Sequence, residues 1–221
     1  MRGSPMKTSI LGIRIIPNAD PLLLTQLNVP EGHRSLGIFT TDCDDVSYAA
    51  LDEATKKAQV SVAYARSMYA GASNASTALA GEFIGILSAP DPAEMRSGLE
   101  AAQLFIQNDA CFYSANDDDS IVYFAHCISR TGSFLSGEAG VPEGTAMAYL
   151  IAPPLEAMVG LDAALKAADV TLRKFYGPPS ETNFAGGLLT GYQAACKAAC
   201  EAFVALQIIM HGFRPIHIYE V

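Results

Sequence analysis

The chain has 221 residues, of which half are hydrophobic and only 17% are charged. This length accommodates two domains of about 110 residues, and the small share of charged residues is typical of a protein that buries surface against copies of itself. The formal net charge of −9 excludes an extended phosphate-binding groove, which needs clustered Lys and Arg. We therefore expect an oligomeric protein with no nucleic-acid partner.

The opening segment and the cysteine count indicate the compartment. Five cysteines are an odd number, and the apolar run near the start contains Arg14, so the pattern of a secretory signal is missing. Even the apolar stretch 192–213 contains Lys197, Glu201 and His211. We expect reduced thiols, a cytoplasmic location and no membrane span.

The first predicted helix contains the decamer LDEATKKAQV at residues 51–60. Apolar residues alternate over 60–64, as expected for a strand. A loop rich in Gly, Ser and Ala follows at 69–82 and leads into a second apolar strand. Apolar residues at helical spacing then predict a helix over 92–106, with Asp91 as its N-cap.

The second half of the chain repeats this order. The segment LDAALKAADV at 161–170 matches the first decamer at six of ten positions. A short apolar alternation, a Gly/Ser/Pro-rich loop at 176–187, an apolar strand and an Ala-rich helix over 192–206 follow it. The pair Ala80-Gly81 that closes the first loop corresponds to Ala185-Gly186 in the second.

This repeat predicts a duplicated α+β fold in which each half reads strand, helix, strand, strand, helix. We expect the first domain at residues 1–110 and the second at 111–221, with the boundary near 107–115. Alanines fall on several faces of each repeat helix, which allows the helix to pack on its own sheet and on a neighbour. The high helix propensity of Ala explains these alanines nearly as well.

The repeated decamer and the Ala-rich QAACKAACEAF resemble helices of the bacterial microcompartment shell domain. Longer segments resemble the ethanolamine-utilisation class of these shell proteins, over about residues 33–206: RSLGIFTTDCDDVSYAALDEATKKA, YARSMYAGAS, AHCISRTGSFLS, MAYLIAPPLEA and PPSETNFAGGLLTGYQAACKAAC. The resemblance implies two tandem, circularly permuted, ferredoxin-like domains. It further implies a homotrimer that forms a pseudohexameric tile beside other shell proteins, with no catalytic residues, no cofactor and no metal.

The acidic run Asp42-Cys43-Asp44-Asp45 precedes the first repeat helix. From the residues alone we favour a structural role, because carboxylates at a helix start accept from open N–H groups and meet the positive end of the helix dipole. The resemblance implies instead that ethanolamine binds in small pockets between subunits. The corresponding residues here are Asp44, with Asp45 as the register alternative, Glu82, Phe112 through its backbone, and Thr182.

The chemistry of that site is coherent, since two carboxylates with a hydroxyl or carbonyl satisfy the three donors of an ammonium and a ligand hydroxyl. The plainer interpretations are a solvated strand start for Glu82 and a hydroxyl that bonds its own loop for Thr182.

The two Gly-containing loops are candidates for lining the gated central pore that the resemblance implies. Small residues give a loop several accessible conformations, although ordinary mobile surface loops have the same composition. The candidate pore residues are Tyr69, Gly71, Ala72, Ser73, Asn74, Ala75, Pro178, Pro179 and Ser180.

Cysteine and histidine positions allow a weak metal hypothesis. Cys196 and Cys200 lie four residues apart on one predicted helix face, and His126 is adjacent to Cys127. No CxxC spacing is present, and free Cys is commonly a small core residue. We favour core packing over a zinc site.

Catalytic motifs are missing from the sequence: it contains no phosphate-binding glycine loop, no GxSxG and no HExxH. Ser129 and Ser133, close to His126, make only a weak nucleophile arrangement. Two alternatives to a shell tile stay open. One is a soluble regulatory sensor that binds small molecules with tandem ferredoxin-like domains, and the other is an enzyme with Cys111 or Cys127 as nucleophile.

Overall fold

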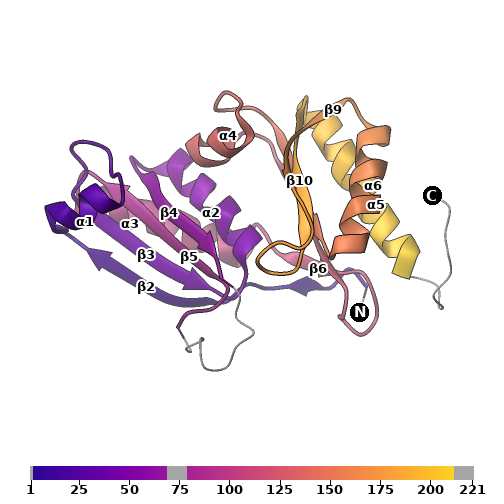
Figure 1. Ribbon diagram of the computed structural model, residues 1–221, viewed down its shortest axis with the longest axis horizontal. Coiled ribbons are helices and arrows are strands. Elements are labelled where there is room, and N and C mark those ends of the chain that lie inside the picture. The colour runs from indigo at the N-terminus through magenta and orange to yellow at the C-terminus, as the bar shows by residue number, and fades with distance from the viewer. Residues whose placement is uncertain (1, 69–78, 212–221) are drawn as a thin grey trace. The chain divides into compact units, whose positions relative to one another are not determined.

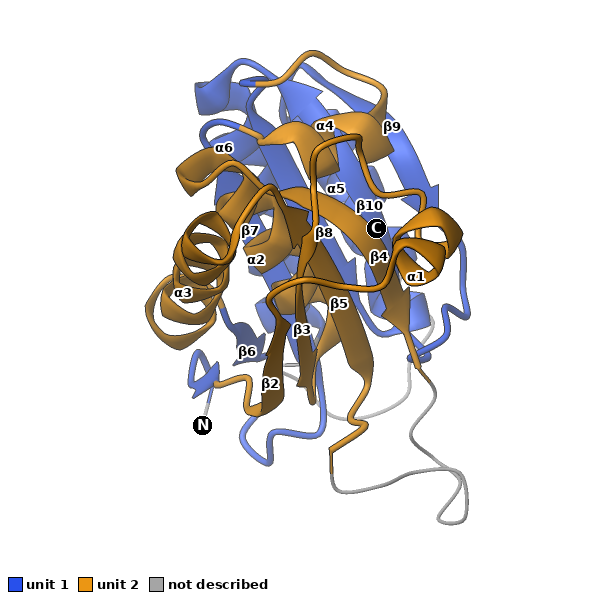
Figure 2. Cartoon of the chain, turned by 90° about the vertical axis from the view of Figure 1, so that its left-hand side faces the viewer, with its two compact units in different colours: residues 1–6, 111–130, 144–221 blue, residues 7–110, 131–143 orange. Residues whose placement is uncertain are grey.

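The structure is a computed structural model that describes residues 2–68 and 79–211 (Figure 1). The chain forms two compact units, coloured in Figure 2. Unit 1 contains residues 1–6, 111–130 and 144–221, and unit 2 contains residues 7–110 and 131–143. Both units combine antiparallel sheet with helices, which confirms the predicted α+β fold. The assignment of one shell domain to each half of the chain stays a prediction.

Unit 2 is built on a four-stranded antiparallel sheet in the order β2-β3-β5-β4. Its strands are β2 (Ile10–Ile16), β3 (Ser35–Thr41), β4 (Ser61–Ser67) and β5 (Phe83–Ala89). Its helices are α1 (Pro21–Gln26), α2 (Asp44–Lys57), α3 (Pro92–Asn108) and α4 (Ser133–Ala139).

Helices α2 and α3 pack together on the unit 2 sheet because their apolar residues recur at helical spacing. Helix α3 approaches the sheet closely at Gly37 of β3, where a Cβ atom would overlap Met95 and Leu99 of α3. The predicted cap of α3 is confirmed: the Asp91 carboxylate accepts from the N–H groups of Ala93 (2.8 Å) and Glu94 (3.0 Å).

Unit 1 is built on a six-stranded antiparallel sheet in the order β1-β6-β7-β8-β10-β9. Its strands are β1 (Pro5–Met6), β6 (Phe112–Ser114), β7 (Val122–Ile128), β8 (Met147–Ala152), β9 (Val170–Tyr176) and β10 (Ala185–Gly191). Its helices are α5 (Pro154–Ala167) and α6 (Gln193–His211), which lie side by side against the sheet (Figure 1).

Helix α6 is long and apolar enough to cross a membrane by length and composition alone. Its buried residues Cys196, Ala199 and Phe203 belong to the hydrophobic core of unit 1. Gly160 of α5 allows this close packing, because a Cβ atom there would overlap the Phe203 ring. These residues explain part of the apolar composition of α6, since 28% of its most apolar window, Gln193–Met210, is buried.

The repeat in the sequence corresponds to a repeat in topology. Strand β3 is followed by α2, β4, β5 and α3, and β8 is followed by α5, β9, β10 and α6. The pairing also matches, since β5 lies between β3 and β4 while β10 lies between β8 and β9. The predicted order of strand, helix, strand, strand, helix is therefore confirmed in both halves.

Candidate functional site

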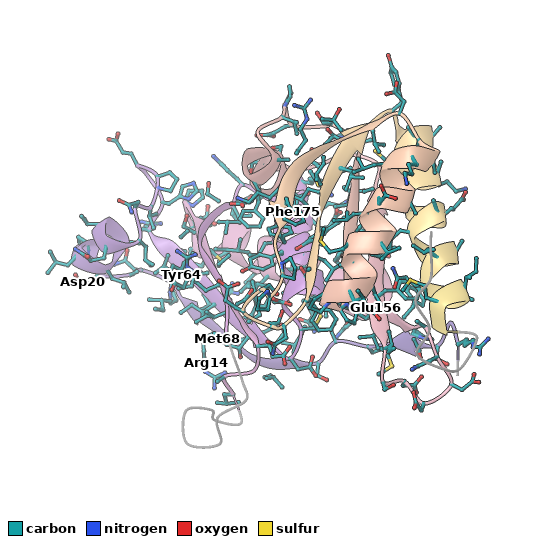
Figure 3. All side chains as sticks on the ribbon, turned by 45° about the vertical axis from the view of Figure 1, so that its right-hand side comes forward. Arg14, Asp20, Tyr64, Met68, Glu156 and Phe175 are labelled. Atoms are coloured by element: carbon teal, nitrogen blue, oxygen red, sulfur yellow. The ribbon has the colours of Figure 1, made fainter. Side chains whose placement is uncertain are left out.

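Gly81 forms the turn that positions the Glu82 carboxylate in unit 2. Its φ is +64°, and a Cβ atom there would overlap the Thr41 carbonyl, so the turn requires glycine. Directly after this turn, the Glu82 N–H donates to the Thr41 carbonyl (2.8 Å), and the Glu82 carbonyl accepts from Met68 N–H (2.7 Å). Glu82 is thereby fixed between the ends of β3 and β4, at the end of β4 where Figure 3 labels Met68.

Two further carboxylates lie in the first turn of α2. Asp44 and Asp45 are 7% and 6% exposed. One Asp44 oxygen accepts from the Asp45 N–H (2.9 Å), and the other accepts from the Ser67 hydroxyl (2.7 Å). The N-cap itself is Cys43, which makes no side-chain capping bond. The predicted favourable helix-start position is confirmed, but the cap residue is Cys43 and not an aspartate.

These residues form a concentrated negative region, which we call the acidic cluster (Asp42, Asp44, Asp45 and Glu82). Partial burial and then the charges of Asp44 and Asp42 raise the pKa of Glu82 above its usual value. Burial, followed by the charge of Asp45, also raises the pKa of the Cys43 thiol. A cation placed here relieves this repulsion, so the acidic cluster favours a small positively charged ligand.

Neutral groups border the acidic cluster. The Tyr48 hydroxyl is 3.0 Å from the Ser67 hydroxyl, which in turn donates to Asp44. Burial raises the pKa of Tyr48, so this phenol stays protonated at neutral pH. Sequence reasoning missed Tyr48 and Ser67. The only available signal was the i,i+4 spacing of Tyr48 from Asp44, which places both on one helix face.

Two predicted site residues belong to unit 1. Phe112 of β6 is buried, with its ring stacked on Phe124 (5.4 Å between centroids) and edge-on to Phe184 (5.6 Å). Thr182 lies in the loop between β9 and β10, where its hydroxyl is 3.4 Å from that of Ser180. The Phe184 contact thus brings Phe112 to the loop that carries Thr182.

The predicted pore residues fall into two groups. Tyr69 and residues 71–75 lie outside the described residues. Pro178, Pro179 and Ser180 lie in the loop between β9 and β10. A surface hollow of about 480 Å³ adjoins this loop and is lined by Phe175, Tyr176, Gly177, Pro179, Ser180 and Glu181.

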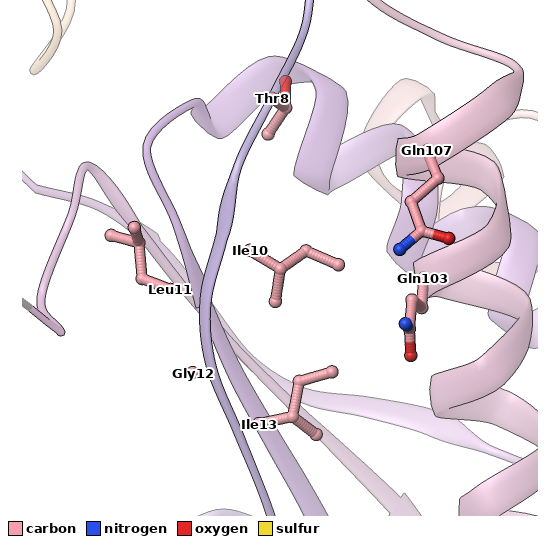
Figure 4. A pocket seen from close by; sticks show the side chains of 7 residues that line it. All are labelled: Thr8, Ile10, Leu11, Gly12, Ile13, Gln103 and Gln107. Atoms are coloured by element: carbon pink, nitrogen blue, oxygen red, sulfur yellow. The ribbon is translucent and has the colours of Figure 1, made fainter.

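A second hollow, of about 360 Å³, lies between β2 and α3 of unit 2 (Figure 4). Ile10 and Ile13 point from the strand toward Gln103 and Gln107 of the helix. Its lining of Thr8, Ile10, Leu11, Gly12, Ile13, Gln103 and Gln107 contains no acid or base. This hollow is therefore not suited to acid–base catalysis.

A buried carboxylate that sequence reasoning missed is structural. Asp52 of α2 accepts from the N–H groups of Gly132 (2.8 Å) and Leu135 (2.9 Å), and so caps α4 from another helix. A Cβ atom on Gly132 would overlap the Thr55 hydroxyl. The available signal was a helix start in TGSFL whose cap position is a glycine with no side chain of its own.

All five cysteines are free thiols. Within residues 2–68 and 79–211, no group of three or more His, Cys, Asp or Glu side chains is arranged to hold a metal ion. Cys196 and Cys200 lie in the unit 1 core, as core packing predicts, with Cys127 packed against them.

Comparison with known proteins shows extensive similarity. No protein-family model matches the chain. The chain is 62% identical to the bacterial microcompartment shell protein EutL of Clostridium perfringens over 203 residues. This alignment covers 92% of this chain and 94% of that protein. The chain is 50% identical over 198 residues to EutL of Salmonella typhimurium, which covers 90% of each. The crystal structure of ethanolamine utilization protein EutL from Leptotrichia buccalis superposes with a TM-score of 0.92 at 65% identity, over 95% of this chain and 97% of that one.

Proposed function

The chain belongs to the EutL family of bacterial microcompartment shell proteins, and we propose that three copies assemble into a tile of the shell with a gated central pore. Its two related halves then provide six similar wedges around the threefold axis. We further propose that the tile is assembled in the cytoplasm beside other shell proteins and has no catalytic activity of its own.

The observation that carries this proposal is that the two halves share their topology but differ in the residues that begin their repeat helices. The two halves share their element order and strand pairing. The first repeat helix begins with Asp44 and Asp45, whereas the second begins with Pro154. Duplication followed by divergence gives a six-cornered tile alternating corners, which six identical domains do not provide.

We propose that the acidic cluster binds protonated ethanolamine. The ligand offers three ammonium N–H donors and one hydroxyl. Asp44 and Glu82 supply carboxylates close enough for their charges to interact, since the charge of Asp44, after partial burial, contributes to the raised pKa of Glu82. Phe112, through its backbone, and Thr182 complete pockets at subunit contacts in this proposal.

In this proposal, ligand binding regulates the pore by changing the relative populations of its open and closed conformers. If ethanolamine binds the closed conformer more tightly, the open fraction falls by no more than that difference in affinity. In this proposal the pore is lined by the loop residues Tyr69, Gly71, Ala72, Ser73, Asn74, Ala75, Pro178, Pro179 and Ser180. Equal affinity for both conformers contradicts the gating part and leaves the binding part intact.

Calorimetry tests the ligand. Ethanolamine is titrated into the assembled wild-type protein and into Asp44→Ala and Glu82→Ala, with Asp162→Ala as the matched control, since Asp162 is an exposed carboxylate on the second repeat helix. Binding heat is expected in the wild type and the control and is lost in the other two variants. No heat in the wild type contradicts ethanolamine as the ligand.

Sedimentation equilibrium tests the assembly independently. The expected mass is three times the 23.4 kDa of one chain, with flat sheets visible by electron microscopy at high protein concentration. A monomer at all concentrations contradicts the tile.

A further inference from the structure

Three of the five thiols meet in unit 1. Cys127 comes from β7, and Cys196 and Cys200 come from α6, which packs on that strand. Cys127 is partly exposed, whereas Cys196 and Cys200 are buried. Cys127 packs against the core cluster that contains Cys196 and Cys200, and a hydrogen bond between the Cys127 and Cys200 thiols is the largest influence on the pKa of both. Two elements that are distant in sequence thus place an accessible thiol against a buried one.

The surroundings give the two thiols different roles. The hydrogen bond from Cys200, with a further contribution from the Lys197 ammonium, lowers the pKa of Cys127 to about 7 despite partial burial. The same hydrogen bond and burial raise the pKa of Cys200, which therefore stays protonated as the donor. The lowered pKa of Cys127 favours its thiolate, and the thiolate is the nucleophile in cysteine oxidation.

We propose that Cys127 and Cys200 form a redox modification site, which reacts with a small peroxide and closes to an intrachain disulfide between β7 and α6. In the first step the Cys127 thiolate attacks one peroxide oxygen, the O–O bond breaks, and sulfenic acid and hydroxide form. That hydroxide takes the proton of Cys200 to give water. The Cys200 thiolate then attacks the Cys127 sulfur, the S–S bond forms, and the S–O bond breaks with release of hydroxide.

The electrons balance, since the two sulfurs together lose the two electrons that reduce the peroxide. The remaining thiols are placed less favourably. Cys196 is buried, and its thiol is directed at the Gly191 carbonyl (3.7 Å). Burial raises the pKa of Cys43. Cys111 is partly exposed like Cys127, but it does not belong to the core cluster that contains Cys196 and Cys200.

Peptide mapping of the full chain tests the site. The reduced wild-type protein is treated with hydrogen peroxide and digested without reductant. We expect one dominant product, a peptide pair joined through Cys127 and Cys200, with Cys43 and Cys111 still reduced. Because the bond ties α6 to the sheet, the oxidised protein should unfold at a Tm raised by roughly 5 °C or more, and reductant should reverse the shift.

Variants separate the two roles. In Cys200→Ala, or in Cys200→Ser if the alanine variant does not fold, dimedone should trap a sulfenic acid at Cys127. In Cys127→Ser, Cys200 should stay reduced. Equal oxidation of all five thiols in the wild type overturns the proposal, as does a bond from Cys127 to Cys196 or Cys111. A reduced Cys127 under conditions that oxidise Cys111 also overturns it, and leaves core packing as the role of the thiols.

Discussion

The helices α2 and α5 contain the same decamer pattern, yet the aspartate that they share has an additional role in α2. Each aspartate pairs with the lysine four residues on, Asp52 with Lys56 (3.5 Å) and Asp162 with Lys166 (2.6 Å). Asp52 is 1% exposed and also caps α4, whereas the side chain of its repeat equivalent Asp162 is 54% exposed. Helix α4 belongs to unit 2 and packs on α2. A repeated letter therefore keeps its place in the helix, while its energetic role depends on what packs against it.

The glycines Gly81, just before β5, and Gly186, in β10, show the converse case. Gly81 and Gly186 are both required, since a Cβ atom would overlap the Thr41 carbonyl in one case and the Leu150 carbonyl in the other. The next residue is Glu82 in the first half and Gly187 in the second. The shared glycines maintain the architecture of both halves, and the differing neighbour gives only the first half a carboxylate at this position.

The largest effect on the free energy of unfolding is expected at Gly81 and Gly186, the glycines that the two halves share. Gly81→Ala and Gly186→Ala should each lower the free energy of unfolding by about 3 kcal/mol, because the new Cβ overlaps a backbone carbonyl that is held in a sheet. Chemical denaturation measures both. A loss in one half only would contradict the shared role of these glycines.

A smaller effect separates the two aspartates. Asp52→Asn should lower the free energy of unfolding by about 2 kcal/mol, since an amide cannot accept both buried N–H groups as well as a carboxylate does. The matched Asp162→Asn removes only an exposed helix pair and should cost less than about 0.5 kcal/mol. Equal losses in the two variants would refute the distinction between a buried cap and a surface ion pair.

Substitution of Glu82 should produce a smaller change in the free energy of unfolding, and this change should depend on pH. Because its pKa is raised in the folded protein, its protonated form is favoured there, and wild-type stability falls as the pH rises through that raised pKa. Glu82→Gln should raise the free energy of unfolding at neutral pH by less than about 1 kcal/mol, since solvent screens much of the repulsion. Below the ordinary Glu pKa the two proteins should be equal in stability. A variant that is less stable than the wild type at neutral pH would contradict repulsion at the acidic cluster.

The affinity for ethanolamine should also depend on the ionisation of Glu82. Below the raised pKa of Glu82 the site is partly neutralised, so affinity should fall as the pH is lowered through that value. In Glu82→Gln this pH dependence should be lost together with most of the affinity. Calorimetry across pH, in buffers matched for ionic strength, measures both changes, and an affinity that is flat in the wild type would argue against Glu82 as a ligand.

Features written locally in the chain could be predicted. The helix and strand periods gave the element order of both halves, and Asp91 was identified as the cap of α3 because its partners are the next residues along the chain. The Ala-Gly pairs marked the turn that precedes β5 and the start of β10.

Features that depend on distant partners could not be predicted. Asp52 meets Gly132 across 80 residues of chain, and no local period encodes that bond. For the same reason the sequence did not indicate that residues 131–143 fold with unit 2, or that the two-residue strand β1 pairs with β6 in unit 1. The acidic cluster was located from the sequence, but Ser67, which donates to Asp44, lies on a separate strand.

The number of ethanolamine molecules bound per chain tests the central claim most directly, because the repeat is written twice while the acidic cluster occurs in one half. Equilibrium dialysis of the assembled protein against saturating radiolabelled ethanolamine measures it. The account predicts one molecule per chain in the wild type and none in Glu82→Ala. Two molecules per chain, or one that persists in Glu82→Ala, would contradict it.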